Sequence, residues 1–233
     1  MKIRNARLLP TFELESAEMA LTGGPIAGID EAGRGPLAGP VVAAAVILDP
    51  ERIPAGIADS KLLDEDSREV LYDRIVATSI VGVGIADVTR IDTDNILNAT
   101  MWAMARALDG LEKRPQLALI DGNRAPTMPC PVRTVVRGDS KCLSIAAASI
   151  IAKVTRDRMM RTFARDYPEY GFERHKGYAT PEHRDALRRL GATPLHRRSF
   201  RPVQFALGLI DDPEIAAQFE LAEAAAIARM AEA

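Results

Sequence analysis

Four carboxylates stand where an apolar segment ends or directly after a glycine: Asp30, Glu31, Asp121 and Asp139. Asp30 and Asp121 each follow an apolar run that predicts a buried strand, and a glycine comes within three residues of each. Such positions, far apart in sequence, can meet at one edge of a sheet. Converging carboxylates repel one another, and a divalent cation relieves the repulsion. Because hard oxygen ligands select Mg²⁺ or Mn²⁺, these residues predict a metal site.

The chemistry that best suits such a site is phosphodiester hydrolysis. Two ions about 3.5–4 Å apart can activate a water and stabilise the leaving oxygen. The three histidines, at 175, 183 and 196, do not resemble a zinc triad, and no Gly-x-Ser-x-Gly elbow is found. Adjacent strand residues face opposite sides, so Asp30 and Glu31 can share a site only if the strand is ending at Glu31. Gly33 and Gly35 favour such an ending.

Each of these residues also has an ordinary structural explanation. Asp30 or Asp121 alone could be a turn residue at a strand end, and Asp139 or Ser140 could cap the following helix. The segment Gly33-Arg34-Gly35 fits neither a dinucleotide-binding loop nor a P-loop, and could be a hairpin turn with a surface arginine. Its glycines would equally let backbone groups approach a ligand. The residues alone leave both interpretations open.

Apolar periodicity predicts the elements that must hold these residues. Strands are expected at 26–29, 41–48, 80–87, 117–120 and 133–136, and helices at 14–21, 65–78, 91–109, 144–167 and 212–232. The region 171–201 is expected to be loop and helix with little apolar periodicity. The first two strands are joined by a tight Gly-Pro loop and predict a hairpin, so the sheet should be mixed. Strands and helices in this arrangement indicate an α/β layered domain.

Length and composition are those of a globular protein. The 233 residues suit one large domain or one domain with a small appendage, and 47% are hydrophobic. The two cysteines, Cys130 and Cys142, lack CxxC spacing, so neither a disulfide framework nor a zinc site is expected. The first seven residues contain no apolar leader, and no run reaches about 18 apolar residues. These features predict a soluble, cytoplasmic protein without a membrane partner.

Charge is distributed unevenly along the chain although the net charge is only −2. Residues 131–204 contain 16 Lys and Arg against seven Asp and Glu, while residues 205–233 contain six acids and only one basic residue, Arg229. A basic region of this kind is the footprint expected for a nucleic-acid backbone. The alternative is a solvated helical face.

Several blocks together resemble one family. The stretch Gly28-Ile-Asp-Glu-Ala-Gly-Arg-Gly-Pro-Leu-Ala-Gly-Pro is similar to the signature of the type 2 ribonucleases H, the ribonuclease HII family. Further blocks follow in the family's order: Asp59-Ser-Lys-Leu-Leu, Asn95-Ile-Leu-Asn-Ala-Thr, Ile120-Asp-Gly-Asn, Gly138-Asp-Ser-Lys, Tyr170-Gly-Phe, His175-Lys-Gly-Tyr-Ala-Thr and His196-Arg-Arg-Ser-Phe. The likeness runs from about residue 10 to residue 204.

The resemblance implies a fold and an activity. The fold is a ribonuclease-H-like mixed sheet of about five strands flanked by helices, with a helical C-terminal extension. The implied organisation is a preamble over 1–25, a catalytic domain over 26–167 and an extension over 168–233 that completes the substrate groove. The implied enzyme is an endonuclease acting on RNA–DNA hybrids and on DNA duplexes containing ribonucleotides. It would cut on the 5′ side of the ribonucleotide, leaving 3′-hydroxyl and 5′-phosphate ends.

The resemblance also implies residue roles. Asp30, Glu31, Asp121 and Asp139 match the catalytic acids that bind metal, with two Mg²⁺ or Mn²⁺ ions in the active complex, and Asp139 is either a ligand or positions metal or water. Gly33, Arg34 and Gly35 match the loop that recognises the 2′-hydroxyl, the group that distinguishes RNA from DNA. Tyr178 matches the tyrosine that stacks on the sugar after the junction. The expected phosphate contacts are Lys61, Ser140, Lys141 and Lys176.

Departures from the family pattern are small. Ala179 stands where relatives often have glycine, which could shift the loop geometry. The acidic tail shows no sliding-clamp-binding peptide, so a clamp partner is not expected. Nothing suggests an obligate oligomer, and a monomer is expected. Two rival hypotheses remain. One is a non-catalytic module that binds RNA–DNA hybrids, and the other is a different metal nuclease or phosphatase on a similar sheet.

Overall fold

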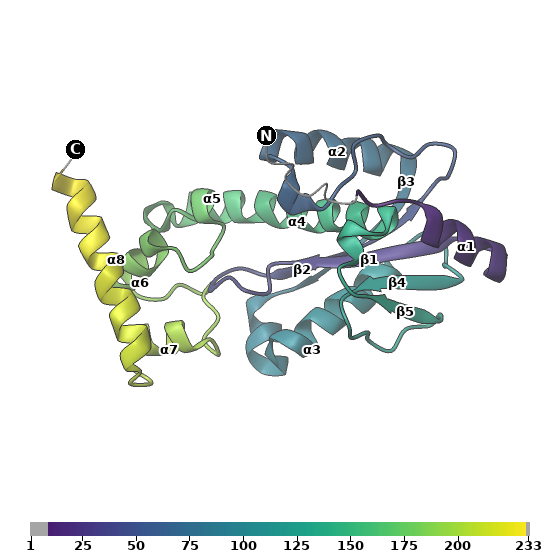
Figure 1. Cartoon of the computed structure of the whole chain (residues 1–233). Helices are drawn as coiled ribbons and strands as arrows, with labels where there is room; N and C mark the ends of the chain where they lie inside the picture. The colour runs from purple at the N-terminus through teal and green to yellow at the C-terminus, as the bar shows by residue number, and fades with distance from the viewer. Residues whose placement is uncertain (1–8, 232–233) are drawn as a thin grey trace, which may run out of the picture. The chain divides into compact units, whose positions relative to one another are not determined.

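The computed structural model describes residues 9–231 (Figure 1). Residues 1–8 of the expected preamble, and Glu232 at the end of the expected last helix, lie outside this range. The chain forms two compact units, which we describe separately. The sheet unit comprises Met1–Ala32, Val42–Ile85 and Thr100–Thr155, and the helical unit comprises Gly33–Val41, Ala86–Ala99 and Arg156–Ala233. The division at residues 25 and 167 that the resemblance implies stays a prediction.

The sheet unit contains five strands in the order β3-β2-β1-β4-β5. Their bounds are β1 Ile26–Ala32, β2 Val41–Leu48, β3 Ser79–Ala86, β4 Leu117–Asp121 and β5 Val132–Val135. β1 pairs antiparallel with β2 and parallel with β4, and β4 pairs parallel with β5. The predicted hairpin and mixed sheet are therefore confirmed. Every residue of β2 is buried, as expected for a strand covered on both faces.

Several helices pack around the sheet (Figure 1). They are α1 (Glu13–Thr22), α2 (Glu65–Thr78), the first half of α4 (Leu143–Asp166) and the second half of α3 (Val88–Asp109). Leu71 and Ile75 of α2 share an apolar cluster with α4 and with one face of β2. On the other side, a Cβ atom at Gly84 would stand 2.0 Å from the carbonyl oxygen of Ala103 in α3. Glycine is needed there because the helix backbone lies directly on the strand.

The predicted helices are confirmed with shifts of a few residues at their ends. α1 ends at Gly23, which has a left-handed φ of 70° and donates to the carbonyl of Met19. α2 begins after Asp64, whose side chain accepts from the backbone N–H of Ser67. The long helix α3 is interrupted at Asn95, where φ is 65° and ψ is 164°. The sequence predicted helix through that residue without the interruption.

The possibility that Asp139 or Ser140 caps α4 is wrong. Both lie in a short 3-10 turn, η2 (Gly138–Ser140), that ends before α4 begins at Leu143. The backbone N–H of Ser144 in the first turn of α4 instead donates to the buried carboxylate of Glu15 at 2.7 Å. The cap comes from α1, which lies 129 positions away in sequence, so local spacing could not indicate it.

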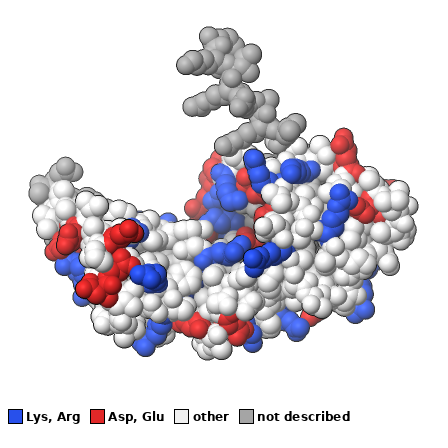
Figure 2. Space-filling model, turned by 60° about the horizontal axis from the view of Figure 1, so that its bottom comes forward, with Lys and Arg blue, Asp and Glu red and all other residues white. Residues whose placement is uncertain are grey.

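The helical unit contains a short 3-10 turn, η3 (Pro168–Tyr170), and helices α5 (Phe172–His175), α6 (Pro181–Leu190), α7 (Arg201–Ala206) and α8 (Pro213–Ala231). Leu187 of α6 is buried with Ile215 and Phe219 of α8. Ion pairs join the same two helices, since Arg188 contacts Glu223 at 2.8 Å. The acidic tail therefore neutralises part of the basic region, and acidic as well as basic side chains lie on the face shown in Figure 2. No helix within residues 9–231 is long and apolar enough to span a membrane.

Candidate active site

Asp30 and Asp121 lie beside each other where the pairing between the parallel strands β1 and β4 of the sheet unit ends. The register pairs Ile29 of β1 with Ile120 of β4, so the next residue of each strand is one of the two aspartates. Asp30 is buried, with 5% of its surface exposed, and Asp121 is half-buried. Neighbouring parallel strands thus place two carboxylates, 91 positions apart in the sequence, at one edge of the sheet.

Asp139 is brought to the same edge by β5. This strand pairs Val135 with Asp121, and the chain then turns through η2. The backbone N–H of Gly138 donates to Oδ1 of Asp121 at 2.6 Å, and Asp139 is buried in the same turn. The structure therefore brings together the three aspartates that the sequence predicted to converge.

Glu31 was expected to share a site with Asp30 only if β1 ended at Glu31, and this condition is not met. β1 does not end at Glu31 but continues to Ala32, and Glu31 pairs with Ala43 of β2. By strand alternation, Asp30 and Glu31 therefore project from opposite faces of β1. By the same alternation, Asp30 lies on the same face of β1 as Gly28, which packs against the start of α4. Glu31 belongs to the cluster through its charge, which acts on Asp30.

The pKa of Asp30 lies well above its ordinary value. Burial is the largest cause, and the negative charge of Glu31 is the next. The charges of Asp121 and Asp139 raise this pKa further. Burial also raises the pKa of Asp121, although hydrogen bonds from the backbone partly offset the effect. Negative charge has thus been gathered where water cannot fully solvate it.

Lys61 brings a positive charge into direct contact with this cluster. Its ammonium donates to Oδ2 of Asp139 at 3.1 Å. Burial lowers the pKa of Lys61, but the hydrogen bond to Asp139 and the negative charges of Asp139, Asp59 and Asp30 together outweigh it, and the net pKa is raised. Lys61 lies in a 3-10 turn, η1 (Ser60–Leu62), that is fixed to α4 by a 2.7 Å hydrogen bond between the hydroxyls of Ser60 and Ser149. A fixed turn therefore presents a positive charge to the acids.

The donor set suits a hard divalent ion. All four acids offer carboxylate oxygens, the ligands preferred by Mg²⁺ and Mn²⁺, and the raised pKa of Asp30 indicates charge that a cation would neutralise. Within residues 9–231, however, no three His, Cys, Asp or Glu side chains are gathered closely enough to form a complete metal cage. The carboxylates share one edge of the sheet and act on one another electrostatically, without being prearranged as a closed coordination shell.

The other predicted phosphate contacts of the sheet unit lie near η2. The hydroxyl of Ser140 donates to the carbonyl of Arg137 at 2.9 Å, and the ammonium of Lys141 donates to the carbonyl of Val136 at 2.7 Å. Both side chains thus stabilise the turn that holds Asp139. Their predicted contact with phosphate stays a prediction.

The remaining predicted residues belong to the helical unit. Gly33 has a left-handed φ of 95°, and Arg34 and Gly35 are exposed. Tyr178 is 43% exposed, and the loop that carries it is bonded to this segment by the N–H of Leu37, which donates to the carbonyl of Gly177 at 2.8 Å. The structure thus places Gly33-Arg34-Gly35 and Tyr178 on two loops that are joined by a backbone hydrogen bond.

Lys176 is placed differently from an ordinary phosphate-binding lysine. Only 8% of its surface is exposed, and its ammonium donates to the carbonyl of Glu173. Its backbone has a left-handed φ of 51°. The side chain therefore stabilises its own loop, next to Tyr178, and its contact with substrate stays a prediction.

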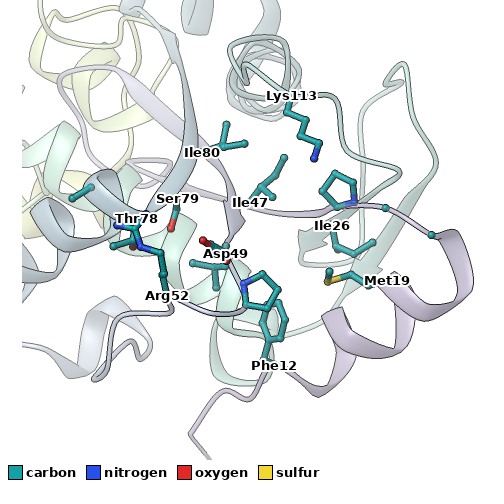
Figure 3. A pocket seen from close by; sticks show the side chains of 16 residues that line it. Phe12, Met19, Ile26, Ile47, Asp49, Arg52, Thr78, Ser79, Ile80 and Lys113 are labelled. Carbon is teal, nitrogen blue, oxygen red and sulfur yellow. The ribbon is translucent and has the colours of Figure 1, made fainter.

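A cavity of about 810 Å³ opens elsewhere in the sheet unit (Figure 3). Its lining includes Ile26 at the start of β1, Leu48 at the end of β2 and Ile80 near the start of β3. Asp30 lies toward the opposite end of β1. The cavity contains none of the predicted catalytic residues, and therefore the polar strand ends, not this hollow, form the candidate site.

Two buried arginines, Arg156 and Arg197, were missed by the sequence analysis. Each has 0% of its surface exposed, and each donates to carbonyl oxygens of the segment 33–40. For Arg156 a signal was present, because it stands four residues from Ala152 and from Met160 in the apolar stripe of α4. An arginine at a core position of a helix indicates a specific buried partner. Arg197 has no comparable signal.

Comparison with known proteins agrees with this geometry. The chain is 57% identical over 194 residues to the ribonuclease HII of Azorhizobium caulinodans, covering 83% of this chain and 75% of that protein. It is 60% identical over 185 residues to the ribonuclease HII of Paramagnetospirillum magneticum, covering 78% and 92%. Its fold resembles the crystal structure of ribonuclease H2 from Pyrococcus horikoshii, with a TM-score of 0.66, 28% identity and coverage of 78% and 96%. Residues 27–203 match the family model for ribonuclease HII, and this chain belongs to the ribonuclease HII family.

Proposed function

We propose that this chain, an endoribonuclease, hydrolyses the RNA strand of RNA–DNA hybrids and cuts on the 5′ side of ribonucleotides embedded in duplex DNA. The products would carry 3′-hydroxyl and 5′-phosphate ends. The observation that supports the chemistry is the convergence of Asp30, Asp121 and Asp139 at one edge of the sheet. A monomeric, cytoplasmic enzyme without a sliding-clamp partner stays a prediction.

Asp30, Asp121 and Asp139 would hold divalent metal, Mg²⁺ or Mn²⁺, and the role of Glu31 as a further ligand stays a prediction. Two such ions, when bound, supply an activated water and stabilise the leaving 3′ oxygen. The chain's own contribution is to keep carboxylate oxygens at fixed strand ends. Asp121 is held by the N–H of Gly138, and Asp30 accepts from the N–H of Glu31 at 2.7 Å. These backbone bonds orient the carboxylates before substrate arrives, which lowers the cost of organising the site.

Lys61 would assist by balancing charge. Its ammonium lies against Asp139 and its side chain is 77% exposed, so it can contact both the acids and an incoming phosphate. A solvated lysine attracts phosphate as a mobile point charge. In this role Lys61 would lower the repulsion between the scissile phosphate and the carboxylates as the substrate binds.

Selection for RNA would reside in the helical unit. The segment Gly33-Arg34-Gly35 would place backbone groups against the 2′-hydroxyl, because glycine lets the chain approach a sugar closely. Tyr178, with its exposed ring, would stack on the sugar that follows the junction. The support for these two roles is the resemblance of the motifs, together with the backbone hydrogen bond that joins the two loops.

The experiment that tests the proposal compares two duplexes of identical sequence, one with a single ribonucleotide and one of DNA only. The enzyme should cut only the first, 5′ to the ribonucleotide, and EDTA should abolish the reaction. Equal cutting of both duplexes would favour a general metal nuclease. Binding of an RNA–DNA hybrid without cleavage under Mg²⁺ or Mn²⁺ would favour a non-catalytic binding module. Either result would overturn the proposal.

A further inference from the structure

Two guanidinium groups lie buried beneath the segment 33–40 in the helical unit. Arg197 donates to the carbonyl oxygens of Gly33 at 2.5 Å, of Arg34 at 2.9 Å, and of Gly39 and Pro40 at 2.9 and 3.2 Å. A single side chain therefore bonds both ends of this segment. The loop keeps its shape through this buried cation.

The bonds made by Arg197 also determine where the loop's N–H groups point. In a trans peptide the C=O of one residue and the N–H of the next lie in one plane and point in opposite directions. The C=O of Gly33 shares its plane with the N–H of Arg34, and the C=O of Arg34 shares its plane with the N–H of Gly35. Because Arg197 holds both carbonyls, the two N–H groups are directed away from it. These N–H groups therefore face the other side of the loop, the side from which a hydroxyl would approach.

Arg156 joins this loop to the one that carries Tyr178. Its guanidinium donates to the carbonyls of Ala38 at 3.0 Å and Pro40 at 2.9 Å, and also to that of Lys176 at 2.9 Å. The same guanidinium lies 5.8 Å from the centre of the Tyr178 ring, within range of a cation–π attraction. One side chain therefore sets the spacing between the two loops.

Two glycines of the segment leave room for Arg156. A Cβ atom at Gly33 would stand 2.1 Å from Nε of Arg156, and one at Gly39 would stand 3.3 Å from Nη2 of Arg156. Both glycines have left-handed φ values, of 95° and 84°. Gly33 is thus required both by its backbone angle and by the space that Arg156 occupies.

Burying two like charges side by side is costly. Burial lowers the pKa of Arg197 to about 9, and repulsion from Arg156 contributes further. Both groups nevertheless stay charged at neutral pH, and their hydrogen bonds are to backbone carbonyls. Guanidinium suits this role because its five N–H donors lie in one plane in fixed directions, whereas the ammonium of lysine offers three donors on a flexible stem. A lysine could keep the charge but could not reach the same set of carbonyls.

We propose that Arg156 and Arg197 are positioning residues for ribonucleotide selection. They would fix the direction of the peptide groups at 33–35 and their spacing from Tyr178, and thereby set the preference for a ribonucleotide over a deoxyribonucleotide. The inference rests on the proposed function of these two loops. It extends that function to two side chains that are themselves fully buried and act through the backbone.

The test uses the full chain with Arg197→Lys or Arg156→Lys. For each variant, kcat and KM are measured on the duplex with one ribonucleotide. The all-DNA duplex is added as a competitor to obtain its inhibition constant. We expect kcat/KM to fall at least about tenfold, while the inhibition constant of the all-DNA duplex changes by no more than about twofold. A general loss of DNA binding would raise both KM for the ribonucleotide duplex and the inhibition constant of the all-DNA duplex, and that result would overturn the inference.

Two controls separate positioning from other effects. Arg198→Lys makes the same chemical change at an exposed neighbour of Arg197. It should leave unchanged the ratio of kcat/KM on the ribonucleotide duplex to the inhibition constant of the all-DNA duplex. Ile75→Val removes a methylene from the core of the sheet unit, where Ile75 is fully buried, and it should lower the Tm without changing the ratio. If the lysine variants lower the Tm as Ile75→Val does but leave the ratio at its wild-type value, the arginines are merely structural.

Failure of the proposed function would be recognised separately. A wild-type enzyme that cuts both duplexes equally would show that the 2′-hydroxyl is not recognised, and the inference would fail with the proposed function. A wild-type enzyme that selects the ribonucleotide, combined with lysine variants that select it equally well, would overturn the inference alone.

Discussion

The backbone N–H of Ser144 donates to the buried carboxylate of Glu15 at 2.7 Å. This bond places the carboxyl group at the positive end of the α4 dipole, four residues after Ser140, the last residue of the turn that holds Asp139. The same contact region includes the N–H of Thr11, which donates to the carbonyl of Lys141 at 3.1 Å. The segment before β1 is therefore part of the support of the candidate site.

Glu15→Ala should lower the free energy of unfolding by about 1–3 kcal/mol, because the substitution leaves the first turn of α4 without its acceptor. Denaturant unfolding followed by circular dichroism would measure the change. Glu13→Ala is the matched control, since Glu13 is exposed two residues earlier in the same helix. Equal stability of the two variants would contradict the capping role.

Asp30→Asn should reduce cleavage at least about 100-fold while increasing stability in metal-free buffer. The activity should fall because a proposed metal ligand is lost, an effect of several kcal/mol on the transition state. The stability rises because the substitution removes a buried charge that repels Glu31 and Asp121. The sign follows from linkage: a carboxyl whose pKa is raised by folding destabilises the fold once pH exceeds its unfolded pKa.

Turnover and thermal unfolding of Asp30→Asn would be measured together in one buffer series, with Asp66→Asn as a control on the exposed start of α2. Near wild-type turnover at saturating Mg²⁺ would show that Asp30 does not bind the catalytic metal. A lower Tm than wild type in EDTA would contradict the electrostatic argument.

Lys61 and Lys176 should respond differently to the same substitution, although both were predicted to contact phosphate. Lys61→Gln should reduce the slope of log KM against log salt by about one, since an exposed lysine releases about one counterion on binding phosphate. Lys176→Gln should leave that slope unchanged and lower the Tm, because its ammonium is bonded within its own loop. Salt titrations of KM would distinguish the two, and an equal change in slope would mean that Lys176 reaches the substrate.

Acid should destabilise the helical unit through a chain of neutral histidines. The N–H of Thr193 donates to Nδ1 of His196 at 2.9 Å, so we assign the proton of His196 to Nε2, 3.0 Å from Nε2 of His183. His183 then donates from Nδ1 to the carbonyl of Tyr178 at 2.9 Å. A second proton on either ring would break this chain.

Burial lowers the pKa of His183 to about 3 and that of His196 to about 4, from an unfolded value of 6.5. The unfolded chain therefore binds more protons below pH 6.5, and stability is fully present above that pH and is lost as pH falls toward 4. At pH 5 the loss should be about 2 kcal/mol per histidine. In urea unfolding at pH 7 and pH 5, His183→Gln should show a smaller drop than wild type. An identical drop would exclude His183 as a source of the acid sensitivity.

Local sequence was enough to predict the strands and most helices, because period-two and period-3.6 patterns report burial directly. It also placed Asp30 and Asp121 at strand ends, since each follows an apolar run and precedes a glycine. The end of β1 was misplaced because Asp30 and Glu31 break the apolar pattern while they still pair with β2. Hydrogen bonding between strands overrides composition at such an edge.

What the sequence by itself determined is the set of reactive groups and the elements that carry them. The tertiary structure decided which of these groups support one another: Glu15 caps α4, Lys61 faces Asp139, and Arg197 holds Gly33 and Arg34. None of these contacts is local, and each depends on burial that a linear pattern does not record. A buried charge must find a partner wherever the fold provides one, so the partner can be identified only once the chain has folded.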